Sequence, residues 1–327
     1  MGEKDIAERT LMELEDVFAD IFNGLLLAGE QVVGAEALTA GKTRGQYKAE
    51  SGRLHEQERD VSKVWDGVRF KVCFAGEAQT KPDRDAVFRV MSYDGSSYRS
   101  QLLKKEWRLV KGTRRLVACR ERYPVVTIIL YFGEREWTYP RNLVNSFRPR
   151  LPDDRVTKVL KNYISDYKVN VFDIGRMKPE DVRLFHSDFR LVADYFVNSR
   201  NNPDYRPDEA VIQHVDEFLK LMAVLTGDNR YEEIGTEFSE EEKKEGISMC
   251  KVLDYREARG RERGISEGIS LGISQGISQG ISQGEAMTLV KLVDNCIRKN
   301  GTSLIAACEM LDVSVEQYNR AMALVES

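Results

Sequence analysis

Apolar residues near the N-terminus recur at the spacing of one helix face. Residues 5–28 read as an amphipathic helix, and Asp5 with Glu8 three residues later gives a capping-box pattern at its start. The same periodicity recurs over residues 83–110, 180–199 and 208–226. We therefore expect amphipathic helices over these ranges.

Runs of apolar and β-branched residues predict strands between these helices. Val68–Ala75 alternates and then becomes apolar, and Gly76–Gln79 follows at its end. Val125–Phe132 is almost wholly apolar, which is typical of a central strand buried on both faces. Tyr167–Ile174 is another strand candidate, whereas the polar residues 41–59 indicate a loop. Strands interleaved with helices predict an α/β fold.

The character of the chain changes after about residue 236. Residues 237–245 are nearly all acidic or lysine, and a Gly-Ile-Ser-x tetrapeptide repeat runs from Gly264 to Gly284. Short helical patterns follow the repeat. These shifts divide the chain into a main domain (residues 1–235) and a charged linker or helix (236–263). The tetrapeptide repeat (264–285) and a small helical module (286–327) follow.

The tetrapeptide repeat allows two interpretations. Glycine costs about 1 kcal/mol in a helix relative to alanine, so the repeat is a poor isolated helix. On a helix, isoleucine every four residues forms a stripe that advances about 40° per repeat, and the glycines allow close backbone approach. We expect the repeat to pair with a second copy and to make the protein a homo-oligomer. A flexible linker is the alternative.

Composition narrows the chemistry that the chain can perform. The net charge is −4 and the pI about 5.7, so DNA binding would depend on a local basic groove. The five cysteines contain no CxxC pair and the three histidines no metal-binding spacing, which argues against a disulfide framework, a zinc cluster or a histidine-based triad. With no signal-peptide pattern and no apolar run near the roughly 20 residues that cross a membrane, we expect a soluble cytoplasmic protein.

A carboxylate and an amide stand out at the end of the first predicted strand. Glu77 and Gln79 are two residues apart, so they project from the same face of a strand. Asp60 lies 17 residues before Glu77, far enough for a neighbouring strand to bring it alongside. Two carboxylates over a sheet end, with the backbone carbonyl of Ala78, suit Mg²⁺, which polarises a phosphate and activates water. This spacing is one form of the PD-(D/E)XK nuclease pattern, with glutamine in place of lysine.

The surroundings of these residues resemble the recombination-promoting nuclease/putative transposase family. The stretches that carry the resemblance are Arg59–Val61, Phe74–Thr80, Asp85–Asp94, Pro124–Gly133 with Trp137, and Ala19–Asn23 on the first helix. The resemblance covers residues 5–235 and implies a restriction-endonuclease-like core, a central mixed sheet flanked by helices, before the helical C-terminal extension. It also implies metal-dependent DNA cleavage linked to recombination or mobile elements. In that family pattern Asp60 and Glu77 bind metal and Gln79 holds the lysine position.

Gln79 leaves the usual chemical argument incomplete, because it carries no charge to stabilise the transition state. Lys81, two residues further along the same face, is a candidate substitute. Lys63 is another if its side chain turns toward Asp60. The alternative for each lysine is a solvated surface position.

Three further residues are candidates for supporting roles. Arg89 and Tyr93 are spaced i, i+4 on the following helix and share a face, where they clamp a phosphate or brace the helix against the sheet. Asp20 on the first helix belongs to the family resemblance. The alternative for Asp20 is a solvated helix face.

The segment 99–122 is the best candidate for a DNA-backbone surface, because basic residues are interleaved there with Trp107. A solvated helix and turn is the alternative. The basic residues that we expect to contact DNA are Lys104, Lys105, Arg108, Lys111, Arg114 and Arg115. The chain thus reads as a Mg²⁺-dependent DNA endonuclease, or alternatively as an inactive nuclease fold that binds DNA or assembles with partners.

Overall fold

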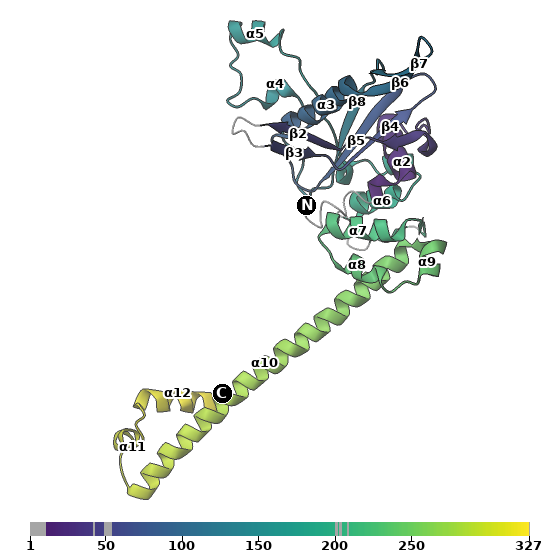
Figure 1. The fold of residues 1–327 in the computed structure, drawn as a ribbon. Helices are drawn as coiled ribbons and strands as arrows, with labels where there is room; N and C mark the ends of the chain where they lie inside the picture. Colours follow the sequence, from purple (N-terminus) through teal and green to yellow (C-terminus); the bar gives the residue numbers. More distant parts are fainter. Residues whose placement is uncertain are drawn as a thin grey trace. The chain divides into compact units, whose positions relative to one another are not determined.

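The computed structural model describes residues 11–41, 43–48, 54–199, 202, 205–207 and 209–326. The chain divides into two compact units, Met1–Arg256 and Glu257–Ser327. The first unit contains every strand of the described residues, and the second is helical (Figure 1). The structure is therefore a mixed α/β unit followed by a helical region, as the sequence predicts.

A five-stranded mixed sheet forms the centre of the first unit. Strands β1, β4 and β5 pair antiparallel, whereas β5, β8 and β9 pair parallel. Their order across the sheet is β1 (Leu38–Ala40), β4 (Val61–Asp66), β5 (Lys71–Gln79), β8 (Val125–Tyr131) and β9 (Asn170–Asp173). Three two-stranded sheets accompany it: β2 (Arg44–Lys48) with β3 (Leu54–Glu58), β6 (Lys105–Val110) with β7 (Thr113–Ala118), and β10 (Val211–Ile212) with β11 (Ile247–Ser248).

Apolar clusters cover both faces of the central sheet. On β8, Ile128 and Leu130 join the large cluster, while Ile129 and Tyr131 join a smaller one. Val125–Phe132 is thus the doubly buried central strand that its composition predicts. The smaller cluster includes residues of α3 (Ala86–Leu103). The helices of the large cluster are α2 (Glu15–Leu26), α6 (Phe189–Asn198), α7 (Val215–Thr226) and α8 (Arg230–Gly235).

Short elements complete the first unit. The short helices are α4 (Leu143–Ser146), α5 (Arg155–Lys161) and α9 (Glu240–Glu245), with 3-10 turns η1 (Ala35–Ala37), η2 (Ile174–Arg176) and η3 (Asp181–Leu184). Helix α10 (Met249–Asn300) begins in this unit, where Met249 and Val252 are fully buried in the large cluster. The start of α10, which lies beyond residue 235, therefore belongs to the core of the first unit.

Several predicted boundaries are wrong. The helix expected over 83–110 ends at Leu103, and the following residues form the ribbon β6–β7. Lys111 and Gly112 have φ of 51° and 78°, the geometry of a two-residue hairpin turn. Val68 lies fully exposed before β5 and not within it, while residues 41–59, expected to be a loop, contribute β2 and β3.

The predicted helices agree with the structure in part. Helix α2 falls within the expected range 5–28, but Asp5 and Glu8, the expected capping box, lie outside the described residues. The helix expected from residue 180 begins at Phe189, after the turn η3, and residues 208–214 precede α7. None of the described helices combines the length and apolar character that a membrane crossing requires.

The second unit holds the repeat and a small helical module. The whole repeat is helical within α10, and its isoleucines are each more than half exposed. The C-terminal module packs the end of α10 against α11 (Leu304–Met310) and α12 (Val315–Glu326) around the buried residues Val293, Ala307 and Ala321. The alternative of a flexible linker does not agree with this helix.

Candidate active site

Strand register brings Asp60 beside the carboxyl-terminal end of β5. Val61, the first residue of β4, pairs with Gly76, so Asp60 lies next to Glu77. The backbone N–H of Ala78 donates a hydrogen bond to Asp60 Oδ2 at 2.9 Å. This contact fixes the Asp60 carboxylate at the strand end, where the sequence spacing predicts that it meets Glu77.

Glu77 and Gln79 share one face of β5, as their i, i+2 spacing predicts, and Glu77 contacts Arg89 of helix α3 from this face. An Arg89 guanidinium nitrogen donates to Glu77 Oε2 at 3.1 Å, and Gln79 Nε2 donates to the same oxygen at 3.4 Å. Arg89 also pairs with Asp83 at 2.6 Å. The structure therefore brings Asp60, Glu77, Gln79 and Arg89 into one constellation.

Burial dominates the electrostatics of this constellation. Loss of solvent raises the pKa of Glu77 to about 7, since it outweighs the opposing charge of Arg89 and is reinforced by Asp60. Burial alone would lower the pKa of Arg89, but the charges of Glu77 and Asp83 raise it, so the guanidinium stays charged. Burial and the charge of Glu77 raise the pKa of Tyr93 to about 12. The site thus holds a fixed cation beside a carboxylate that ionises near neutral pH.

A pocket of about 800 Å³ opens over these side chains. Two oxygens of the site, Glu77 Oε1 and Gln79 Oε1, are fully buried and have no hydrogen-bond partner. A buried acceptor without a donor is costly, so such a pair points to a ligand. The residues that line the pocket include the whole constellation described above. They are Asp60, Glu77, Ala78, Gln79, Thr80, Lys81, Pro82, Asp83, Arg84, Asp85, Arg89, Tyr93 and Tyr139.

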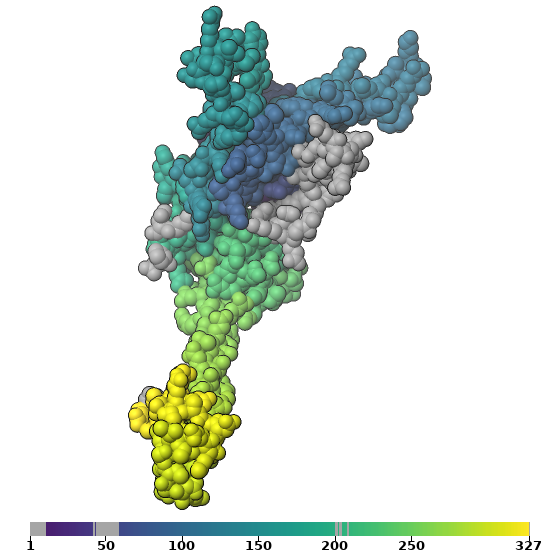
Figure 2. All heavy atoms as spheres, turned by 90° about the vertical axis from the view of Figure 1, so that its left-hand side faces the viewer, coloured from purple at the N-terminus to yellow at the C-terminus, as the bar shows by residue number. Residues whose placement is uncertain are grey.

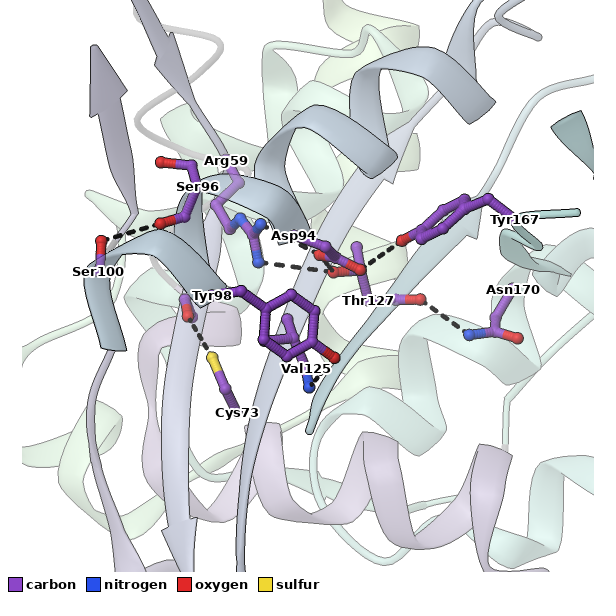
Figure 3. Close-up of polar contacts among 11 residues, drawn as sticks. Arg59, Cys73, Asp94, Ser96, Tyr98, Ser100, Val125, Thr127, Tyr167 and Asn170 are labelled. Atoms are coloured by element: carbon purple, nitrogen blue, oxygen red, sulfur yellow. Dashed lines mark hydrogen bonds and ion pairs between the residues drawn. The ribbon is translucent and has the colours of Figure 1, made fainter. Parts of the chain in front are cut away.

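A buried ion pair connects residues that neighbour the pocket lining, and its polar contacts are drawn in Figure 3. Arg59, next to Asp60, donates to Asp94, next to Tyr93, at 3.2 Å. Asp94 also accepts hydrogen bonds from the hydroxyls of Thr127 on β8 and Tyr167. Arg59 lies over the Tyr93 ring at 5.4 Å. The network therefore positions the start of β4 and the middle of α3, which both line the pocket.

Sequence reasoning assigned no role to this network. Arg59 and Asp94 lie within the stretches of the family resemblance, so their position beside Asp60 and Tyr93 was an available signal. Tyr167 had no such signal, because its contact with Asp94 joins residues 73 positions apart. Asp83 was likewise missed, although it lies six residues before Arg89.

The structure does not bring every candidate into the pocket. Asp20 is buried, so the solvated-face alternative is wrong; its carboxylate accepts hydrogen bonds from the backbones of His186 and Ser187. This carboxylate thus joins α2 to the segment before α6. Lys63 pairs with Glu15 at 2.6 Å on the α2 side and does not turn toward Asp60. Lys81 is exposed and lines the pocket.

The basic candidates lie on or beside one structural element. Lys104 precedes β6, Lys105 and Arg108 lie on β6, and Lys111 lies in the turn. Arg114 and Arg115 lie on β7. The expected helix and turn is therefore a two-stranded ribbon, on which the basic residues alternate between two faces.

Comparison with known proteins supports the resemblance drawn from the sequence. Residues 71–205 match the model of a family described as putative transposase, YhgA-like. The matched range begins with β5, contains Glu77 and Gln79, and ends after α6. Asp60 precedes it. No curated protein and no solved structure matches the chain.

Proposed function

We propose that this protein is a metal-dependent DNA endonuclease that acts in recombination or on mobile elements. The single observation that carries the proposal is the pair of buried, unpartnered oxygens of Glu77 and Gln79 beside Asp60 in an open pocket. The match to YhgA-like transposases supports it, because transposition requires phosphodiester chemistry on DNA. The restriction-endonuclease-like character of the core is part of this proposal.

The donor set fits a hard divalent cation such as Mg²⁺. Oxygen is the element that Mg²⁺ prefers, and the ion is commonly held by one or two carboxylates, with waters and substrate phosphates completing its shell. Asp60 and Glu77 are the carboxylates, and the Ala78 carbonyl and Gln79 Oε1 are further oxygen donors. Among the described side chains no group of three or more His, Cys, Asp and Glu residues is arranged to hold a metal, so substrate oxygens are part of this scheme. When bound, the cation supplies Lewis-acid polarisation of the phosphate and lowers the pKa of a water.

The remaining side chains of the pocket perform the work that the protein itself must do. Arg89 provides the fixed positive charge that Gln79 lacks, and its 35% exposed side chain can contact a phosphate oxygen. Gln79 orients Glu77 through its amide N–H. The side chain of Tyr93, which stays protonated at neutral pH, donates a hydrogen bond toward the substrate. These groups bind and orient the scissile phosphate.

The test combines cation binding with plasmid nicking. Isothermal titration with Mg²⁺ and Mn²⁺ gives a readout that is independent of turnover, and supercoiled plasmid with and without EDTA reports cleavage. Glu77→Ala is expected to abolish both in a folded protein. The matched control is Asp254→Asn, which neutralises an exposed carboxylate outside the pocket and should change neither. Full nicking by folded Glu77→Ala would remove the assignment from this site.

The alternative, an inactive nuclease fold that binds DNA, has one observation in its favour. Glu77 Oε2 already accepts hydrogen bonds from Arg89 and Gln79, so a cation must compete with an existing ion pair. Wild-type protein that binds DNA but neither binds divalent cations nor nicks plasmid would establish this alternative.

We also propose that the helical repeat mediates self-association. Its isoleucines form an exposed stripe. A Cβ atom added at any of its glycines would meet no other group within 4 Å, so the backbone there is open to a partner. A nuclease that cuts both strands benefits from pairing, because two sites then meet one duplex. Sedimentation velocity tests this arrangement as described in the Discussion.

A further inference from the structure

The β6–β7 ribbon projects from the first unit (Figures 1 and 2), and the residues on both of its faces are exposed or half-buried. None of its residues is buried. Its stem is firmly anchored: Gln101 of α3 exchanges two hydrogen bonds of 3.0 Å with the backbone of Tyr123, and Cys119 N–H donates to the Lys104 carbonyl at 2.9 Å. The ribbon is therefore an exposed arm with a fixed base.

One face of this arm carries large apolar side chains. Trp107 pairs with Leu116 directly across the ribbon, so the two share a face with Leu109. Their exposed fractions are 64%, 48% and 73%, respectively. Exposed apolar patches of this kind mark interaction surfaces.

The other face brings two arginines together. Arg108 and Arg115 are directly opposite each other, an arrangement that is unfavourable unless an anion lies between them. Arg108 pairs with Glu106 on this face at 2.6 Å, whereas no carboxylate of the described residues pairs with Arg115, or with Arg114 beside Leu109 on the Trp107 face. Residues 104–122 contain eight basic and two acidic residues, net +6 in a chain of net charge −4.

The turn adds a further positive charge at the tip. Lys111 adopts a φ of 51°, a left-handed conformation that asparagine and glycine tolerate better than lysine does. Asparagine would suit this turn better, so the lysine contributes its charge at some conformational cost. The tip, both faces and the base of the arm all carry basic side chains.

We infer that the β6–β7 ribbon is a DNA-gripping arm, in which the basic residues contact backbone phosphates and the Trp107 face lies against the bases in a groove. A groove of duplex DNA admits a two-stranded ribbon, and apolar side chains on such arms wedge against base steps. The net charge of +6 over residues 104–122 favours a polyanionic partner such as duplex DNA, and a protein partner is an outcome that the experiment distinguishes. The inference rests on the proposed function for its substrate, although binding is measured without cleavage.

The arm also sets a spacing along the duplex. Arg89 in the pocket and Lys104 at the base of the arm are both carried by α3 and its end, 15 residues apart. At a rise of 1.5 Å per residue this is about 22 Å, the length of roughly six base pairs. A duplex that lies along α3 would therefore meet the base of the arm about six base pairs from the scissile phosphate.

The experiment measures affinity for a fluorescent 24-base-pair duplex by anisotropy, in EDTA and over a range of KCl concentrations. Arg114→Gln with Arg115→Gln is expected to weaken binding at least tenfold at about 100 mM salt and to lower the salt slope by about 1.8. Trp107→Ala should weaken binding with an unchanged slope, because it removes a base contact and no phosphate contact. Lys158→Gln with Lys161→Gln on α5 is the control of equal charge and should bind as wild type.

Lys111→Asn is a variant whose loss of DNA affinity cannot be attributed to unfolding of the ribbon, because asparagine suits the turn better than lysine does. It should weaken binding several-fold while thermal stability is kept or raised. Wild-type affinity in all arm variants, or equal loss in the α5 control, would overturn the inference. So would an arm that proves to be a protein contact, with Trp107→Ala changing the sedimentation coefficient but not DNA affinity. Failure of the nuclease proposal is separate: wild-type protein that does not nick plasmid but shows these arm-dependent affinities would keep the arm and remove only the nuclease assignment.

Discussion

Substitution of Glu77 by glutamine tests the electrostatics of the pocket. The glutamate is 5% exposed, and burial raises its pKa from 4.5 to about 7. An acid whose pKa is raised by folding stabilises the folded state most below pH 4.5. That contribution falls as the pH rises from 4.5 to 7 and is constant above this window. At 1.36 kcal/mol per pKa unit, the loss is about 3 kcal/mol at pH 8.

Glu77→Gln keeps the size of the side chain and one accepting oxygen but removes the titration. Arg89 retains Asp83 as its ion-pair partner in the variant. We therefore expect the metal-free variant to exceed wild type by about 3 kcal/mol in free energy of unfolding at pH 8, relative to their difference at pH 4.5. Above pH 7 this difference should no longer change.

Urea unfolding in EDTA at a series of pH values measures this difference, with tryptophan fluorescence as the signal. All three tryptophans (Trp65, Trp107 and Trp137) lie in the first unit, so the signal reports that unit. Tenfold excess of Mg²⁺ over its Kd should then stabilise wild type by about 1.4 kcal/mol and leave the variant unchanged. A difference between the two proteins that does not vary with pH would refute the reasoning.

Three further changes test separate parts of the structure. Gln79→Lys should keep or raise plasmid nicking, because it restores the charge usual in the wider superfamily; complete loss in a folded protein would assign a specific accepting role to Gln79 Oε1. Asp94→Leu should lower the free energy of unfolding by about 3–5 kcal/mol in urea titrations, since it removes one partner of the buried Arg59–Asp94 ion pair, and a loss below 1 kcal/mol would contradict a structural role. A chain ending at residue 260 keeps the core residues at the start of α10 and should sediment as a monomer, whereas the full chain should sediment as a dimer or larger. If both chains are dimers, the contact lies in the first unit, and if both are monomers, the repeat does not mediate self-association.

Local periodicity predicted the central features of the site. The alternation of a strand places Glu77 and Gln79 on one face, and the apolar character of Val125–Phe132 predicts a strand buried on both faces; the structure confirms both. The length of chain before Glu77 was enough to expect Asp60 beside it. These inferences succeed because they depend on the geometry of one element or of two neighbouring strands.

Other features depend on contacts that no local pattern reports. The carboxylate of Asp20 is bound by the backbones of residues 166 and 167 positions away, so a polar helix face and a buried anchor look alike in the sequence. The ribbon was read as a helix because Lys111-Gly112 is not one of the usual hairpin turn pairs. The alternation of Trp107 and Leu109 is too short to distinguish the two-residue period of a strand from the 3.6-residue period of a helix.

The span of the Arg59–Asp94 network has a consequence for the order of folding. Its bonds join residues that are 35, 68 and 73 positions apart, so the chain must close long loops before the pocket is complete. The ribbon closes through a two-residue turn, and such hairpins form within about 1–10 μs. During synthesis the ribbon can therefore form before Thr127 and Tyr167 have been added, when the Arg59–Asp94 pair still lacks the hydroxyl contacts that complete its network. In terms of the proposed functions, a growing chain would form the arm that binds DNA before the two sides of its pocket are fully fixed.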